Sequence, residues 1–346
     1  AYTGLNRAWA DWGFTKAVYI ATGNPLNYSA AVSACVSAGN NLCIAVGFGF
    51  YDSLNSAASS NPGKKFAIVD YDVPDSAPNN LRGIRFREKE VGYLAGVLAA
   101  KMTDDHKVGV IGGIPVPPVV NFTTGYRNGA QCTDNSINVM EEYSNDFGNP
   151  SHGAQIAEGM INNGAEVIFA AAGSTGNGAI LYAAQNGMYA IGVDSDQYYN
   201  LFGGGSVDGS GNLLTSAMKR VDNAVYMTID DFLHSSDPWG DEQEYGLEQE
   251  GVGLASYHET YDDVPTLVEK YVEDVATKII AGQIHVDDPC AISVWYMYFS
   301  GTPDETALLE NIAAIQAADP TLPRIIATSR TDQGQYGDAI QQGWGP

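Results

Sequence analysis

The sequence predicts an open, doubly wound α/β fold built on two parallel sheets. Short β-branched runs alternate with helical stretches, and these runs are apolar nearly throughout, which is typical of strands buried on both faces of a parallel sheet. The chain of 346 residues is long enough for two lobes, each with its own core. The predicted strands cover residues 17–21, 42–48, 65–70, 107–113, 165–171 and 189–194.

A helix, not a strand, opens the chain. Residues 1–12 carry Leu5, Ala8, Trp9 and Trp12 at helical spacing, so these four side chains are expected on one buried face. Chains of this class usually begin with a strand that lies in the middle of a sheet. Here no strand precedes the first helix, so another part of the sequence would have to supply the central strand.

Two longer helices are predicted further along the chain. The stretch "EKEVGYLAGVLAAKM" covers residues 88–102 and lies between two predicted strands. A second helix is expected at residues 265–284, opened by Pro265, because proline suits the first turn of a helix.

The charge balance excludes several classes of partner. Asp and Glu number 41 against 17 Lys and Arg, which gives a formal net charge of −24. A surface this acidic repels nucleic acid and anionic lipid, so neither is expected as a partner. No run of about 18 apolar residues occurs, so membrane insertion is not expected. A chain that starts at Ala1 without Met is expected to be processed and secreted, and therefore extracellular or on the cell surface.

The cysteines permit disulfides but do not indicate a metal site. Cys35 and Cys43 lie on neighbouring predicted elements that could bring them together, and Cys132 and Cys290 are far apart in the sequence. One or two disulfides and buried free thiols fit this count equally well. No CxxC pair or Cys/His cluster appears, so no structural metal is expected.

Two calcium-like stretches and two glycosylation sequons carry weaker signals. The stretches "DSDQ" (194–197) and "DGSGN" (208–212) loosely resemble calcium loops, but neither has the full pattern, so no cofactor is expected and Ca²⁺ is only an alternative. Asn27 and Asn121 each begin an Asn-X-Ser/Thr sequon, which has meaning only if the chain is exported to a glycosylating surface.

Glycines, acids and aromatic residues gather at the carboxyl ends of the predicted strands, which is where ligands bind in this fold. Turns and helix caps need the same residue types, but their occurrence after five strands favours a ligand cleft. No nucleophile elbow, HExxH or phosphate loop is present, so a binding protein is favoured over an enzyme. The strand ends concerned are residues 47–50, 70–72, 112–118, 173–178 and 194–197.

The order of the motifs resembles the basic membrane protein (BMP) family. The stretches "AGVLAAKM", "IGVDSDQ" and "TSAMKRVD" carry this resemblance, which runs from about residue 1 to about residue 286. The resemblance implies nucleoside-binding receptors of ABC transporters with the type I periplasmic-binding-protein fold. It also implies two Rossmann-like (flavodoxin-like) lobes joined by a hinge. We expect lobe 1 at residues 1–113 plus 255–346, and lobe 2 at residues 114–254.

Matching positions give candidate ligand residues. Asp194 and Lys219 correspond to the acid and lysine with which the family binds ribose, since a carboxylate accepts from vicinal hydroxyls and a lysine donates to them. Asp196 competes with Asp194 for this role. Phe147 is the expected stacking aromatic for a purine, with Tyr143 as the alternative.

About 60 residues extend beyond the family's usual end, from residue 287 to 346. This extension is expected to contain a strand at 291–301, a helix at 302–320 and a strand from Arg324 to Thr328. The last strand and the turn after it resemble the family's first strand and its ligand-binding turn. Asp332 and Tyr336 in this turn are therefore expected to bind ligand, and Phe48 and Gly176, at the ends of other predicted strands, are expected to contribute as well.

Two arrangements would place this C-terminal strand in the first-strand position. The strand folds back into its own sheet, which makes the chain a circular permutant, or it enters the sheet of a neighbouring subunit, which produces filaments or tubes. The alternative is an ordinary extension packed on the surface. Two functions are therefore considered. In the first, the chain is a solute-binding protein that binds a nucleoside-like ligand, and the protein itself polymerises through this strand. In the second, it is a structural subunit of a filament or tube, in which ligand binding is secondary or lost.

Overall fold

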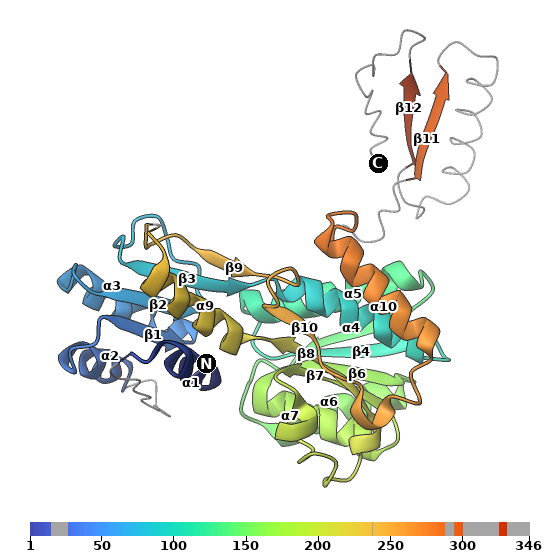
Figure 1. The fold of residues 1–346 in the computed structure, drawn as a ribbon. Helices are drawn as coiled ribbons and strands as arrows, with labels where there is room; N and C mark the ends of the chain where they lie inside the picture. Colours follow the sequence, from blue (N-terminus) through green and yellow to red (C-terminus); the bar gives the residue numbers. More distant parts are fainter. Residues whose placement is uncertain (15–26, 237, 288–293, 300–324, 331–346) are drawn as a thin grey trace. The chain divides into compact units, whose positions relative to one another are not determined.

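The computed structural model describes residues 1–14, 27–236, 238–287, 294–299 and 325–330. The chain separates into a large unit at residues 1–287 and a small unit at residues 288–346, and each is described by itself. The large unit contains two sheets with helices around them (Figure 1). This confirms the predicted α/β class with parallel sheets.

The first sheet has four parallel strands in the order β1-β2-β3-β9. Three of its strands come from the N-terminal part of the chain, and β9 is added from much later in the sequence. Its elements are α1 (Tyr2–Trp12), α2 (Tyr28–Ser37), β1 (Leu42–Val46), η2 (Phe48–Phe50), α3 (Tyr51–Ser60), β2 (Lys65–Val69), β3 (Leu81–Phe86), α9 (Val221–His234) and β9 (Gln243–Tyr245).

The second sheet has six strands in the order β10-β8-β7-β6-β4-β5, all parallel except β10. In Figure 1, α4 and α5 cover one face of this sheet and α6 and α7 cover the other. Its elements are α4 (Glu88–Met102), β4 (Lys107–Gly112), α5 (Pro117–Thr133), β5 (Asn138–Tyr143), α6 (Pro150–Asn162), β6 (Val167–Ala171), α7 (Gly173–Gln185), β7 (Tyr189–Asp194), α8 (Gln197–Asn200), η3 (Ser210–Asn212), β8 (Leu213–Lys219), β10 (Val252–Leu254), η4 (His258–Thr260) and α10 (Thr266–Ile280).

The chain crosses between the two sheets after β3, after β8 and after β9. The expected division placed residues 1–113 and 255–346 in lobe 1 and residues 114–254 in lobe 2. The sheets divide the chain differently, because β4 pairs with β5 and β6 while β9 pairs with β3. The first crossing therefore precedes residue 107 rather than following residue 113.

The helix pair α4 and α5 packs unusually closely, and glycine makes this approach possible. A Cβ atom at Gly96 would overlap the carbonyl oxygen of Tyr126, and one at Gly129 would overlap that of Tyr93. Nearly every residue of α4 is buried, which explains why its sequence is apolar on all sides. The helix predicted at residues 88–102 is confirmed with the same bounds.

The first helix is confirmed, but its buried face differs from the expected one. Ala8 packs against Val225 and Ile229 of α9, while Leu5 and Trp12 are half-buried at the edge of this cluster. Trp9 is 52% exposed, so the prediction that it is buried was wrong. Gly4 lies directly on the backbone of Asp222, and this close approach turns the helix so that Trp9 faces outward.

Most predicted strands are confirmed within one or two residues, including β2, β4, β6 and β7. The strand predicted at residues 17–21 lies outside the described residues. Three long strands, β3, β5 and β8, were not predicted as strands. The helix expected at residues 265–284 is α10, with Pro265 immediately before its first residue.

The small unit contains a parallel pair of strands, β11 (Val294–Phe299) and β12 (Ile325–Arg330), with Val294 opposite Ile325. Both strands were predicted in this extension. The pairing does not confirm that the C-terminal strand supplies the first strand of the four-stranded sheet, because β12 is paired with β11 of its own chain. The helix predicted at 302–320 lies outside the described residues.

One disulfide joins Cys35 of α2 to Cys43 of β1. The sequence left this pairing open, and the structure settles it because the two residues lie on packed neighbouring elements with Cα atoms 6.2 Å apart. Cys132 on α5 is free and half-buried, and Cys290 lies outside the described residues. The disulfide ties the outer helix α2 to the edge of the first sheet.

Breaking this disulfide should destabilise the first sheet. Closing a loop of this length removes chain entropy from the unfolded state, which corresponds to about 2.6 kcal/mol of stability. Cys35→Ser should therefore lower the free energy of unfolding by about that amount in urea titrations of the oxidised protein. Cys132→Ser is the matched control and should change the midpoint little. Equal midpoints for the two variants would contradict the prediction.

Candidate functional site

A buried lysine lies where strands of both sheets end. Lys219 is the last residue of β8, and its Nζ atom lies 2.9 Å from Oδ2 of Asp70 and 3.7 Å from Oδ1 of Asp194. Asp70 directly follows β2 of the first sheet, and Asp194 ends β7 of the second. The Lys219 side chain is only 9% exposed, so its charge is held by carboxylates from the two sheets together.

Both aspartates adopt the same uncommon backbone conformation. Asp70 has φ 65° and Asp194 has φ 64°, in the left-handed region that non-glycine residues rarely occupy. This conformation costs on the order of 1 kcal/mol or more at each residue and persists only where the surrounding structure holds it. Such strain is concentrated at functional sites, and here it occurs at the corresponding strand end of each sheet.

A second buried acid, Glu88, extends this cluster. Glu88 begins α4, is 2% exposed, and accepts a hydrogen bond of 3.1 Å from Nδ2 of Asn121. Burial raises the pKa of Glu88 to about 7, because loss of hydration outweighs the opposing effects of Lys219 and Asn121. Glu88 therefore exchanges a proton near neutral pH.

Neighbouring carboxylates keep the Lys219 ammonium group protonated. Burial alone would lower the pKa of an ammonium group, but the charges of Asp194, Asp70 and Glu88 raise the pKa of Lys219 above its ordinary value. The Asp194 side chain is 57% exposed and can meet a ligand from solvent. Oδ1 of Asp70 is buried and has no hydrogen-bond partner among the described residues. Together these groups offer one donor and several acceptors to a polyhydroxylated ligand.

Phe147, the predicted stacking aromatic, is half-buried on a glycine surface. A Cβ atom at Gly113 would overlap its ring, and one at Gly173 would press on its backbone and Cβ. These two glycines follow β4 and begin α7, so the ring sits at the carboxyl edge of the second sheet. The alternative, Tyr143, covers Gly112, and its hydroxyl shares a hydrogen bond of 2.7 Å with Oγ1 of Thr123.

The other predicted residues have varied positions. Phe48 is exposed in η2, just after β1. Gly176 is buried in the first turn of α7. Asp196 caps α8 through the N–H of Tyr198 and pairs with Nε2 of His258 at 2.8 Å, so its carboxylate is occupied by contacts within the protein. Asp332 and Tyr336 lie outside the described residues.

The roles of Asp70, Glu88 and Asn121 are not evident from the sequence. Asp70 was one of the acids noted at strand ends, but no pattern linked it to Lys219. Glu88 lies in the first turn of a helix, where acids commonly complement the helix dipole. Its burial beside Asn121 follows from the packing of α4 on α5 and could not be predicted from local sequence.

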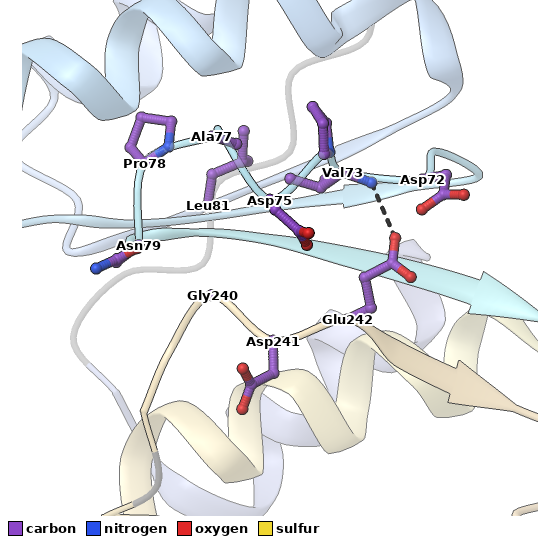
Figure 2. Close-up of a pocket in the computed structure, with 11 residues that line it drawn as sticks. Asp72, Val73, Asp75, Ala77, Pro78, Asn79, Leu81, Gly240, Asp241 and Glu242 are labelled. Carbon is purple, nitrogen blue, oxygen red and sulfur yellow. Dashed lines mark hydrogen bonds between the residues drawn. The ribbon is translucent and has the colours of Figure 1, made fainter.

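A separate acidic pocket lies beside the four-stranded sheet of the large unit. It has a volume of about 680 Å³ and lies between the loop after β2 and the segment that leads into β9. Figure 2 shows Asp75 and Glu242 approaching this space from opposite sides, with Glu242 accepting a hydrogen bond from the N–H of Val73 at 2.9 Å. Burial and the neighbouring Asp72 raise the pKa of Glu242. The pocket is lined by Asp72, Val73, Pro74, Asp75, Ala77, Pro78, Asn79, Leu81, Gly240, Asp241 and Glu242.

Comparison with known proteins identifies the family. The model of the Bmp family, described as ABC transporter substrate-binding proteins that are PnrA-like, matches residues 1–289. The chain belongs to this family. The Bmp match covers both sheets and the lysine cluster, and it ends where the small unit begins.

Individual relatives agree with this assignment. An ABC transporter nucleoside-binding protein BmpA from Lactococcus lactis is 31% identical over 282 residues, covering 79% of this chain and 78% of that protein. A CD4+ T-cell-stimulating antigen from Listeria monocytogenes is 31% identical over 282 residues, covering 78% of this chain and 76% of the other. A solute-binding protein of an ABC transporter system from Aeropyrum pernix shares the fold, with a TM-score of 0.68, 23% identity and 92% coverage of both chains.

The described residues contain neither a membrane-spanning helix nor a cluster of metal-ligating side chains. None of the helices in the described part of the chain is both long and apolar enough to cross a membrane. Within the same ranges, no three His, Cys, Asp or Glu side chains are grouped so that they could hold a metal ion.

Glu88 should make stability depend on pH. The pKa of the Glu88 carboxyl is about 7 in the folded protein and 4.5 in the unfolded chain. Between these two pH values the folded state binds more protons than the unfolded state, so the free energy of unfolding falls as pH rises. The loss is nearly complete at pH 8 and amounts to about 3 kcal/mol. Glu88→Gln should therefore remove this part of the pH dependence and raise the free energy of unfolding at pH 8.

Urea titrations at pH 4.5, 6 and 8 measure this effect. Glu158→Gln, which changes an exposed glutamate on α6, is the matched control and should leave the pH profile as it is in the unchanged protein. The prediction is wrong if the Glu88 and Glu158 variants have the same profile.

Proposed function

We propose that the chain is a solute-binding protein whose ligand is nucleoside-like, held between the two sheets at their carboxyl edges. The observation that carries this proposal is the ammonium group of Lys219, buried between carboxylates from both sheets. Membership of a substrate-binding family and a relative named as nucleoside-binding support it.

The chemistry of the cluster suits a ribose. A carboxylate such as Asp194 accepts hydrogen bonds from two neighbouring hydroxyls, and an ammonium such as Lys219 donates to their oxygens. Charge-assisted bonds of this kind are about twice as strong as neutral ones. Since Asp194 is exposed while Lys219 is buried, the ligand enters on the side of Asp194 and completes the coordination of the lysine.

An aromatic ring at the carboxyl edge of the second sheet is proposed to hold the base. Phe147 is fixed on the glycine surface at the same edge of the second sheet, and we propose that one face of its ring stacks on a purine. Phe48 and the turn containing Gly176 are proposed as further contacts from the two lobes. Binding, rather than catalysis, is the proposed activity, because these groups stabilise a ligand and none of them is paired as nucleophile and base.

An exported location fits this function. The Cys35–Cys43 disulfide is characteristic of proteins in oxidising compartments. We propose that the chain acts outside the cytoplasm, at the cell surface or in the medium.

Calorimetry with adenosine, guanosine and inosine tests the ligand class. At least one nucleoside should bind, and Lys219→Met or Asp194→Asn should weaken binding 10- to 100-fold, since each removes hydrogen bonds to a charged group. Lys278→Met alters an exposed lysine on α10 and is the matched control, with unchanged affinity expected. A folded sample that gives no heat with any nucleoside, while binding another solute, would overturn the nucleoside assignment.

We also propose strand addition as a second candidate function, because β1 is the last strand on its side of the four-stranded sheet among the described residues. Lys65 N donates to Asn41 O at 2.8 Å, and Gly47 N donates to Val69 O at 3.1 Å. Backbone groups of successive residues in a strand point alternately to the two sides. Because Asn41 and Gly47 bond toward β2, the residues of β1 with even numbers direct their N–H groups away from β2. These outward groups belong to Leu42, Ile44 and Val46. The proposed partner is the C-terminal strand of another copy, which would link subunits head to tail into filaments or tubes.

Electron microscopy of the full chain over a range of concentrations tests this second candidate. Val46→Pro removes one outward N–H group while leaving the bonds to β2 in place, so it should abolish any polymers. Val46→Thr keeps the N–H group and is the matched control. Monodisperse particles of the unchanged protein at all concentrations would rule out strand addition.

A further inference from the structure

Two asparagines begin Asn-X-Ser/Thr sequons, and their surroundings differ sharply. Asn27 is exposed and immediately precedes α2, and its side chain makes no capping hydrogen bond to that helix. The sequon serine, Ser29, is also exposed on the first turn of α2. Both side chains that a glycosylating enzyme must reach are therefore accessible.

The backbone at this position is well anchored although the side chains are exposed. The ring of Tyr28, the middle residue of the sequon, packs on Phe50 with ring centroids 4.1 Å apart. A Cβ atom at Gly49 would collide with the same ring, so the ring lies directly on the η2 backbone. Tyr28 thus points inward, and the residues on either side of it point to solvent.

The second sequon is enclosed in the fold. Asn121 lies within α5, and its Nδ2 donates to the buried Glu88 at 3.1 Å. Thr123 is fully buried, and its Oγ1 bonds to the carbonyl oxygen of Val120 and shares a hydrogen bond with the Tyr143 hydroxyl. A sugar on Asn121 would occupy the nitrogen that Glu88 uses and would force a polar group between α4 and α5.

The disulfide supplies an independent indication of the compartment. Cys35 lies on α2, about two turns beyond Asn27, and is bonded to Cys43, a linkage that forms and persists outside a reducing cytoplasm. N-glycosylation of Asn-X-Ser/Thr takes place in the same exported setting. Formation of the disulfide and glycosylation of Asn27 therefore require the same kind of compartment.

We propose that Asn27 is an N-glycosylation site of this protein and that Asn121 is not. In the reaction, Nδ2 of Asn27 bonds to the anomeric carbon of an oligosaccharide carried on a lipid phosphate. The bond from that carbon to the phosphate oxygen breaks, the lipid phosphate leaves with the electron pair, and the amide loses one proton. No oxidant or reductant takes part. The assignment is independent of the ligand that the lysine cluster binds.

Mass spectrometry of the secreted, folded full chain tests the assignment. The protein is produced behind a secretion signal in a host that has an oligosaccharyltransferase and is treated with peptide N-glycosidase, which converts each glycosylated Asn to Asp. We expect the peptide containing Asn27 to carry this conversion and the peptide containing Asn121 to lack it. An unmodified Asn27, or a modified Asn121, would overturn the proposal.

Three variants strengthen the test. Asn27→Gln and Ser29→Ala should each reduce the intact mass by one glycan, and the second keeps the asparagine in place. Asn121→Gln should leave the glycan mass unchanged. Because both sequons are also measured in the unchanged protein, the result does not depend on whether a variant is secreted. Loss of glycan in Asn121→Gln, or its retention in Ser29→Ala, would contradict the assignment.

Discussion

The buried ammonium group of Lys219 is the constraint on which the rest of the site depends. Removing a cation from water costs several kcal/mol unless opposite charges replace the lost hydration. Here the replacement comes from Asp70 on one sheet and Asp194 on the other, both in the left-handed backbone conformation. The strand ends of two separate sheets must therefore converge on one atom.

Close packing of α4 on α5 supplies the second part of the arrangement. Glycines at the contact let the two backbones touch, and this fixes Glu88 at the start of α4 opposite Asn121 of α5. A helix that could shift would allow water to reach Glu88 and return its pKa to the ordinary value. The raised pKa is therefore a consequence of rigid packing rather than of a single hydrogen bond. It gives the site a proton that exchanges near neutrality.

The sequence predicted those parts of the fold in which local pattern and burial agree. Strands β4, β6 and β7 are apolar runs and were found, whereas β3 was missed because it contains Arg82. That arginine is buried only because Asp231 pairs with it at 2.9 Å and the Trp239 ring covers it, and both partners are more than a hundred residues away. Asp194 and Lys219 were named from a family resemblance. The parts played by Asp70 and Glu88 depend on contacts across the fold that no local motif records.

The charge balance of the cluster limits what the site can accept. One ammonium faces two carboxylates at the strand ends, and Glu88 adds a third negative charge whenever it loses its proton. An anionic group entering beside Asp194 would meet repulsion in a partly desolvated space, where charges are poorly screened. A neutral ligand with neighbouring hydroxyls meets no such repulsion, because it donates to Asp194 and accepts from Lys219 without adding charge. For the proposed ligand site, the excess of carboxylates would thus favour an uncharged polyol over an anion, and more strongly as pH rises through 7.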